Sequence, residues 1–168
     1  MKNLEAKFPL ANHADAEARA TALGYTRRAI LHQRDTFFRV PNGKLKLREE
    51  NRTAVLIHYR RAESGSLMLS DYEIVPVAEP ARTLQILSDA LGKLATIEKV
   101  RTLLTRENVR LHLDQVTNLG NFGEIEAVIA EGDARDRSTI AVDTLLKALA
   151  IKQPDLIELS YFEMQPQN

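Results

Sequence analysis

Charged and apolar residues alternate with a period of two in seven segments of this chain. Lys46 and Arg48, for example, alternate with Leu45 and Leu47. Because successive side chains of a β-strand point to opposite faces of a sheet, the charged residues of each segment share one face. If these faces converge, they bring together seven cationic and five acidic side chains, namely Lys7, Lys46, Arg48, Arg60, Lys99, Arg101 and Arg110 with Glu5, Glu73, Asp114, Glu124 and Glu126. The pattern therefore predicts a sheet with one highly charged face.

A solvated sheet face is the simplest alternative explanation, since antiparallel sheets commonly expose one face to water. Here, however, the charged faces carry few of the Thr, Ser and Gln residues that usually accompany charges on a solvated strand. The predicted helices also need the apolar face of the sheet, which leaves the charged face to curl on itself and close. A charged interior persists only where a ligand, a metal ion or water compensates the charges. The sequence therefore predicts a cavity that holds a polyanion together with a divalent metal ion.

Length and composition bound the class of protein and its partners. The chain has 168 residues, which we interpret as a single domain over residues 1–168, and 23 basic residues balance 23 acidic ones. Because the chain has neither a net positive charge nor a basic stripe, nucleic acid and anionic membranes are not expected partners. The absence of Cys, of a signal peptide and of about 18 consecutive apolar residues predicts a soluble, cytoplasmic protein. The oligomeric state stays open, with a homodimer as one alternative.

The periodicities predict an α+β protein in which an antiparallel sheet predominates. Helices are expected over residues 14–23, 80–94 and 136–150. Strands are expected over residues 3–10, 26–32, 35–40, 44–50, 54–61, 69–77, 97–106, 109–116 and 124–130. The segment 155–164 is compatible with either a short strand or a short helix.

Eight short motifs follow one another along nearly the whole chain. The first is Asn3-Leu-Glu-Ala-Lys7, and the later ones include Gly43-Lys-Leu-Lys-Leu-Arg-Glu49, Leu119-Gly-Asn-Phe-Gly-Glu-Ile-Glu126 and the closing Ser160-Tyr161. In this order they resemble the motifs of the CYTH superfamily, the triphosphate tunnel metalloenzymes, and especially the branch that contains class IV adenylyl cyclases and thiamine triphosphatases. The resemblance implies a closed eight-stranded antiparallel β-barrel, the triphosphate tunnel, with flanking helices.

The same resemblance implies roles for the charged residues. Phosphate is expected to bind to Lys7, Lys46, Arg48, Arg60, Lys99, Arg101 and Arg110, of which Lys7, Arg60 and Lys99 are also the expected catalytic residues. Mg²⁺ or Mn²⁺, which prefer oxygen ligands, would be held by Glu5, Glu73, Asp114, Glu124 and Glu126. The implied partner is a small triphosphate, such as ATP, tripolyphosphate or thiamine triphosphate. We expect His112 to be a hydrogen-bonded neighbour of this site, with the orientation of a phosphate or a water as the alternative.

One departure from the family pattern lies at Asn3, where the family motif E-x-E-x-K has its first Glu. Asn offers a neutral oxygen, so the expected metal site loses one negative charge. Three functions therefore stay open: metal-dependent hydrolysis of an inorganic or organic triphosphate, conversion of ATP to cyclic AMP by a class IV adenylyl cyclase, and non-catalytic sensing of polyphosphate or nucleotide. We place hydrolysis first because no residue set demands adenine. Lys99→Ala or Arg101→Ala is expected to weaken triphosphate binding steeply with little effect on folding.

Overall fold

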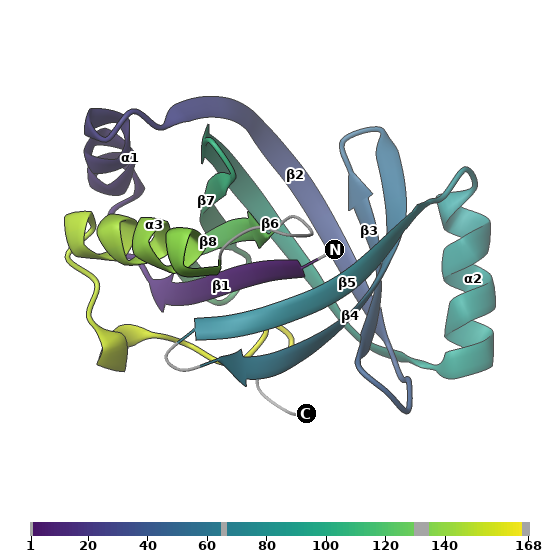
Figure 1. Ribbon diagram of the computed structural model, residues 1–168. Coiled ribbons are helices and arrows are strands. Elements are labelled where there is room, and N and C mark those ends of the chain that lie inside the picture. The colour runs from purple at the N-terminus through teal and green to yellow at the C-terminus, as the bar shows by residue number, and fades with distance from the viewer. Residues whose placement is uncertain (1, 65–66, 130–134, 166–168) are drawn as a thin grey trace.

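Eight antiparallel strands form a closed barrel in the computed structural model, which describes residues 2–64, 67–129 and 135–165 (Figure 1). The strands are β1 (Lys2–Pro9), β2 (Thr26–Phe38), β3 (Lys44–Glu50), β4 (Thr53–Ser64), β5 (Leu67–Pro76), β6 (Lys93–Arg106), β7 (Val109–Val116) and β8 (Gly120–Ile129). Their order around the barrel is β1-β5-β4-β3-β2-β6-β7-β8, and the last strand pairs with the first. The predicted closed eight-stranded antiparallel barrel with flanking helices is confirmed.

The strand β2 departs most from the prediction, because one continuous strand of 13 residues replaces two short ones. It stays continuous because it pairs along almost its whole length with β6. Register shifts between Arg27 and Ala29 and between Phe37 and Phe38 absorb the bend that a closed barrel requires. The strand β8 begins earlier than predicted, at Gly120, and Ala130, where the predicted strand ends, lies outside the described residues.

Three α-helices, α1 (His13–Ala22), α2 (Pro80–Leu91) and α3 (Arg135–Ala148), lie on the outside of the barrel (Figure 1). The helices α1 and α3 pack on one side, over a core of apolar residues that includes Phe8, Leu111, Ile125 and Leu145. On the other side, α2 covers a smaller cluster from β2, β3 and β4. The largest hydrophobic core thus lies between the helices and the outer face of the barrel. On the inner face, polar side chains share the space with a second apolar cluster, which includes Phe37, Ile97 and Phe122. In the described part of the chain, no helix has the length and apolar character needed to cross a membrane.

The glycine at position 123 allows β8 to approach β1 closely. Gly123 lies opposite Phe8 in the register, and a Cβ atom built on it would lie 2.1 Å from the Phe8 ring. Any larger residue would therefore collide with a fully buried aromatic side chain. Position 120 favours glycine for a different reason, because its φ of 106° lies in the region that other residues rarely adopt.

Candidate functional site: a charged barrel interior

The inner face of the barrel carries the charged cavity that the sequence predicts. Residues directly opposite each other in an antiparallel pair point to the same face, so the register shows which side chains share the interior. Between β1 and β8, Glu5 lies opposite Glu126 and Lys7 opposite Glu124. A cavity of about 270 Å³ is lined by side chains from all eight strands. Its charged lining residues are Glu5, Lys46, Arg48, Glu50, Arg61, Arg101, Arg110, Glu124 and Glu126.

Two of the predicted site residues, Arg60 and Glu73, do not face this interior, and their predicted placement is wrong. In the pair of β4 with β5, Tyr59 lies opposite Tyr72 and both line the cavity. Arg60 and Glu73 alternate with them and are exposed on the outer face. Because strand side chains repeat with a period of two, a shift of one residue reverses the faces. Arg61, which the sequence analysis missed, occupies the inward position instead.

A single buried carboxylate, Asp35 on β2, lies at the centre of a cationic cluster. Arg48 donates two hydrogen bonds of 2.7 Å to its two oxygens. Lys46 and Lys99 each donate a 3.0 Å hydrogen bond to Asp35 Oδ2. Burial alone would raise the pKa of Asp35, but the three cations hold it well below its usual range. Asp35 therefore stays ionised and keeps three phosphate-binding candidates together.

Burial disfavours the charged form of the lysine side chains inside the barrel. Burial and the neighbouring Arg48 lower the pKa of Lys46 to about 7, although Asp35 opposes the shift. Burial likewise lowers the pKa of Lys99 and of Lys7. An additional anion inside the barrel would favour the charged form of these ammonium groups.

Arg101 on β6 and Asp114 on β7 form a buried bidentate ion pair. Both of its hydrogen bonds are 2.6 Å long, and the guanidinium also donates to Glu124 Oε2 at 2.8 Å. The Tyr161 hydroxyl donates to Asp114 Oδ2 at 2.9 Å. Burial opposes the ionisation of Asp114, but Arg101 lowers its pKa. Both Asp114 oxygens are thus engaged by Arg101 and Tyr161, so the structure does not bring this predicted metal ligand into the acidic cluster.

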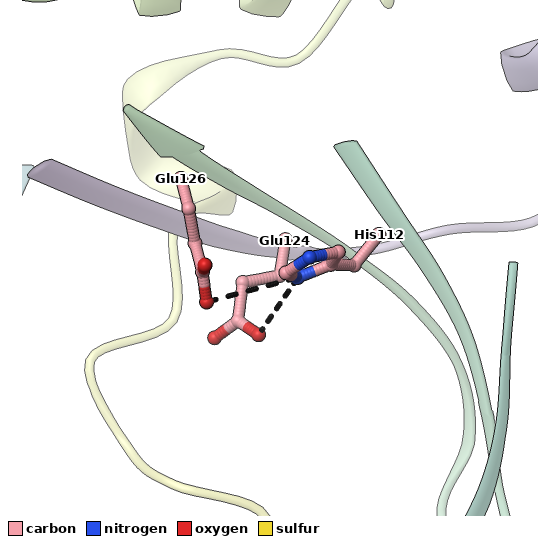
Figure 2. A group of neighbouring side chains, drawn as sticks. All are labelled: His112, Glu124 and Glu126. Atoms are coloured by element: carbon pink, nitrogen blue, oxygen red, sulfur yellow. Dashed lines mark ion pairs between the residues drawn. The ribbon is translucent and has the colours of Figure 1, made fainter. Parts of the chain in front are cut away.

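His112, Glu124 and Glu126 form the cluster that best suits a metal ion. One candidate ligand atom of each lies within 4.8 Å of the others (Figure 2). Glu5 lies opposite Glu126, and burial, together with the charges of Glu126 and Glu124, raises the pKa of Glu5 to about 7 despite the nearby Arg61. Among the described residues, Glu5 Oε2 and His112 Nδ1 are buried without a hydrogen-bond partner, and Glu5 Oε2 forms an ion pair with Arg61 at 3.1 Å. A buried nitrogen without a hydrogen-bond partner among several carboxylate oxygens fits the ligand set of a divalent cation.

The C-terminal segment lies across one end of the barrel. It contains a short 3₁₀-helix, η1 (Gln153–Asp155), and then turns, so the segment 155–164 forms neither of its two predicted alternatives, a short strand or a short helix. Tyr161 packs against Phe122 of β8 and beneath Lys7 of β1, and Phe162 packs against Phe37 of β2. On these strands the cavity-lining residues lie toward the opposite ends. The cavity therefore faces the end of the barrel away from the C-terminal segment.

The family profile of the CYTH domain matches residues 1–161. This chain belongs to the CYTH family. A candidate adenylate cyclase of Methanocaldococcus jannaschii is 26% identical over 133 residues, which are 78% of this chain and 75% of that protein. A Pyrococcus horikoshii protein superimposes with a TM-score of 0.85 at 19% identity, over 96% of this chain and 98% of its own. A Hippeastrum protein, described as a candidate adenylyl cyclase with a dominant triphosphatase activity, superimposes with a TM-score of 0.69 at 17% identity, over 98% and 94% of the two chains.

Asn3 is the residue at which this CYTH protein departs from the opening motif. Its side chain is buried, donates a 3.4 Å hydrogen bond to Glu126 Oε2 and accepts a 3.2 Å hydrogen bond from the Tyr72 hydroxyl. Asn3 therefore holds Glu126 in place instead of adding a negative charge beside it. The carboxylates near Asn3 in the barrel interior are those of Glu5, Glu124 and Glu126.

Replacing Asn3 with Glu is expected to tighten Mg²⁺ binding roughly tenfold, because affinity rises with the number of charged oxygen ligands. Without metal, the same variant is expected to lose roughly 1–3 kcal/mol of unfolding free energy, since the new carboxylate replaces a hydrogen-bond donor to Glu126. Titration calorimetry and urea unfolding measure the two effects. Asn121→Glu, at an exposed position of β8, is the matched control and should change neither. Unchanged or weaker Mg²⁺ binding by Asn3→Glu would show that residue 3 does not approach the ion.

Proposed function

We propose that this CYTH protein hydrolyses a triphosphate that is held inside the barrel together with a divalent cation. The observation that carries the proposal is that one cavity contains both an acidic cluster and five cationic side chains, those of Lys46, Arg48, Arg61, Arg101 and Arg110. Cations placed around phosphate oxygens neutralise the charge that develops as a phosphoryl group is transferred. Membership of the CYTH family supports the same substrate class.

The buried lysines and arginines would bind and orient the phosphate chain. The ammonium group of Lys46, which lines the cavity, would donate charge-assisted hydrogen bonds to phosphate oxygens, and the arrival of those oxygens would favour its protonated form. Arg61 takes the role that the sequence analysis gave to Arg60, because it is the arginine on the inner face. Glu5, Glu124 and Glu126 would hold Mg²⁺ or Mn²⁺, which when bound supplies further charge neutralisation and polarises a phosphoryl oxygen or a water.

Formation of cyclic AMP is the second candidate function. Leu31, Leu103 and Ile74 line the same cavity and would offer an apolar surface to a nucleoside base. The relative from Methanocaldococcus jannaschii is also named as a candidate adenylate cyclase. In that reaction the ribose 3′-hydroxyl attacks the α-phosphorus and pyrophosphate leaves. Hydrolysis stays first because the charged lining accounts for a triphosphate without requiring a base.

Product analysis tests the proposal. The purified protein is incubated with ATP, tripolyphosphate or thiamine triphosphate, each with Mg²⁺ or Mn²⁺, and the products are separated by chromatography. Orthophosphate released chiefly from tripolyphosphate or thiamine triphosphate supports hydrolysis. Cyclic AMP together with pyrophosphate from ATP supports the cyclase instead. Tight binding without any product would contradict both and favour a sensor.

Glu126→Gln is expected to lower the turnover number about 100-fold or more, because a charged group that stabilises the reacting centre becomes neutral. Glu73→Gln is the matched control, since this glutamate is exposed on the outer face of β5. Steady-state hydrolysis assays at saturating metal compare the two variants. Equal losses in both would show that our assignment of the inner and outer faces is wrong.

A further inference from the structure

The imidazole of His112 has a position that hydrogen bonding does not explain. The residue is only 5% exposed, and its Nδ1 atom has no hydrogen-bond partner among the described residues. This atom lies 3.7 Å from Glu124 Oε2 and 3.7 Å from Glu126 Oε1 (Figure 2). Such distances are too long for N–H···O hydrogen bonds, yet both oxygens surround the same nitrogen. An unpartnered buried nitrogen between two carboxylates needs another explanation.

The backbone fixes this arrangement. His112 lies directly opposite Glu124 in the register of β7 and β8, and Glu126 follows two residues later on the same face. Ligand atoms that share an ion at about 2.1 Å are separated by roughly 3.0–3.4 Å. The two separations from His112 Nδ1 exceed that range by only a few tenths of an ångström, and all three ligand atoms lie within 4.8 Å of one another, so side-chain rotations would bring them to an ion's coordination distances. One ion could therefore contact all three side chains without any movement of the strands.

A protonated His112 acting as a plain ion-pair partner is the competing explanation. The two glutamates already have cationic neighbours, because Arg101 donates to Glu124 at 2.8 Å and Arg110 lies 3.8 Å from Glu126. A further cation at His112 would add little to this compensation. Asn3, moreover, supplies no negative charge where the CYTH motif has its first Glu. The imidazole nitrogen of His112 would supply the metal ligand that Asn3 does not supply as a carboxylate.

We propose that His112 binds the metal ion through Nδ1, and that the site therefore prefers a first-row transition ion to Mg²⁺. Imidazole nitrogen suits transition ions, whereas Mg²⁺ strongly favours oxygen ligands and retains its waters. The affinity of the protein should rise from Mg²⁺ to Mn²⁺ and again to Co²⁺. The inference concerns the same acidic cluster as the proposed function, but it is decided by metal binding alone.

Pulsed electron paramagnetic resonance of bound Mn²⁺ tests the inference in the full chain without any triphosphate. A nitrogen directly bonded to Mn²⁺ produces ¹⁴N modulation, which we expect for the wild type and for His32→Gln. That control removes an exposed histidine of β2. His112→Gln should lose the modulation. Because the wild-type spectrum is informative by itself, the test stands even if His112→Gln folds poorly. Bound Mn²⁺ without nitrogen modulation, or no binding of Mn²⁺ at all, overturns the inference.

Affinities provide the second readout. In His112→Gln, we expect the dissociation constants of Mn²⁺ and Co²⁺ to rise roughly 10- to 100-fold, and that of Mg²⁺ to change less than about threefold. Equal losses for all three ions would contradict a specific role for the imidazole. Nitrogen modulation in a protein that hydrolyses no triphosphate would support this inference and refute the proposed function. If the protein hydrolyses a triphosphate but its bound Mn²⁺ gives no nitrogen modulation, the proposed function is supported and this inference is refuted.

Discussion

Replacing Arg101 with Met is expected to lower the free energy of unfolding by roughly 3–5 kcal/mol, because a buried ion pair that loses one partner leaves an uncompensated charge. Arg101 is 4% exposed and contacts two buried carboxylates, those of Asp114 and Glu124. Methionine retains the apolar stem but none of the three hydrogen bonds. The sequence analysis expected little effect on folding from a change at this position, and the buried pair is the reason that the expectation now differs.

Urea unfolding measured by circular dichroism gives the free energies. Arg110→Met is the matched control: its side chain is 46% exposed and lies 3.8 Å from Glu126, so a loss within about 1 kcal/mol is expected. Adding Asp114→Asn to Arg101→Met should recover part of the loss, because one buried negative charge disappears with its partner. If Arg101→Met lowered the free energy of unfolding no more than Arg110→Met does, water would have to solvate the Asp114 and Glu124 carboxylates inside the barrel.

Asp35→Asn is the second change with a large expected effect. It would leave three cations, Lys46, Arg48 and Lys99, without the carboxylate that they share, and we expect a loss of roughly 3–5 kcal/mol. For a chain of this length, a loss of that size corresponds to a fall in melting temperature of about 10 °C or more. A polyanion that binds the same three cations should restore much of the stability, because a ligand that binds only the folded state stabilises it.

Thermal unfolding with and without tripolyphosphate measures this rescue. Saturating tripolyphosphate should raise the melting temperature of Asp35→Asn by more than that of the wild type, so that the difference between the two proteins narrows. Asp143→Asn, on the exposed face of α3, should behave like the wild type under both conditions. A smaller rise for Asp35→Asn would mean that this carboxylate positions the cations for phosphate instead of competing with it.

The sequence allowed a correct prediction of the inner face in β3 and β6. Lys46 and Arg48 flank Leu47, and Lys99 and Arg101 flank Val100, so the local alternation assigns each charged pair to one face, and Glu49 and Glu98 are the charges of the opposite phase. In β5, the charges of Asp71 and Glu73 share one phase, yet that phase faces outward. In β4, the two candidate arginines, Arg60 and Arg61, are adjacent, so each phase contains one of them. Only the pairing with β3 and β5 decides between them, and that pairing is a long-range property that local alternation does not contain.

Asp35 was missed for a related reason. Splitting β2 into two strands placed this residue at a strand start, where its position opposite Arg48 was not recognisable. Its partner Lys99 lies 64 residues away in the sequence, so no local spacing reveals the pair. His112 was interpreted as a neighbour of the site, whereas its register opposite Glu124 places it inside the acidic cluster.

The C-terminal segment across one end of the barrel has a kinetic consequence. Tyr161 and Phe162 lie at that end, on the side away from the cavity-lining residues. A ligand that enters from the other end must leave through the same opening. If a bound chain is cleaved there, the fragment nearer the opening has to depart first, and the inner fragment is retained until then. Release would therefore be ordered, and the inner product would compete directly with the next substrate.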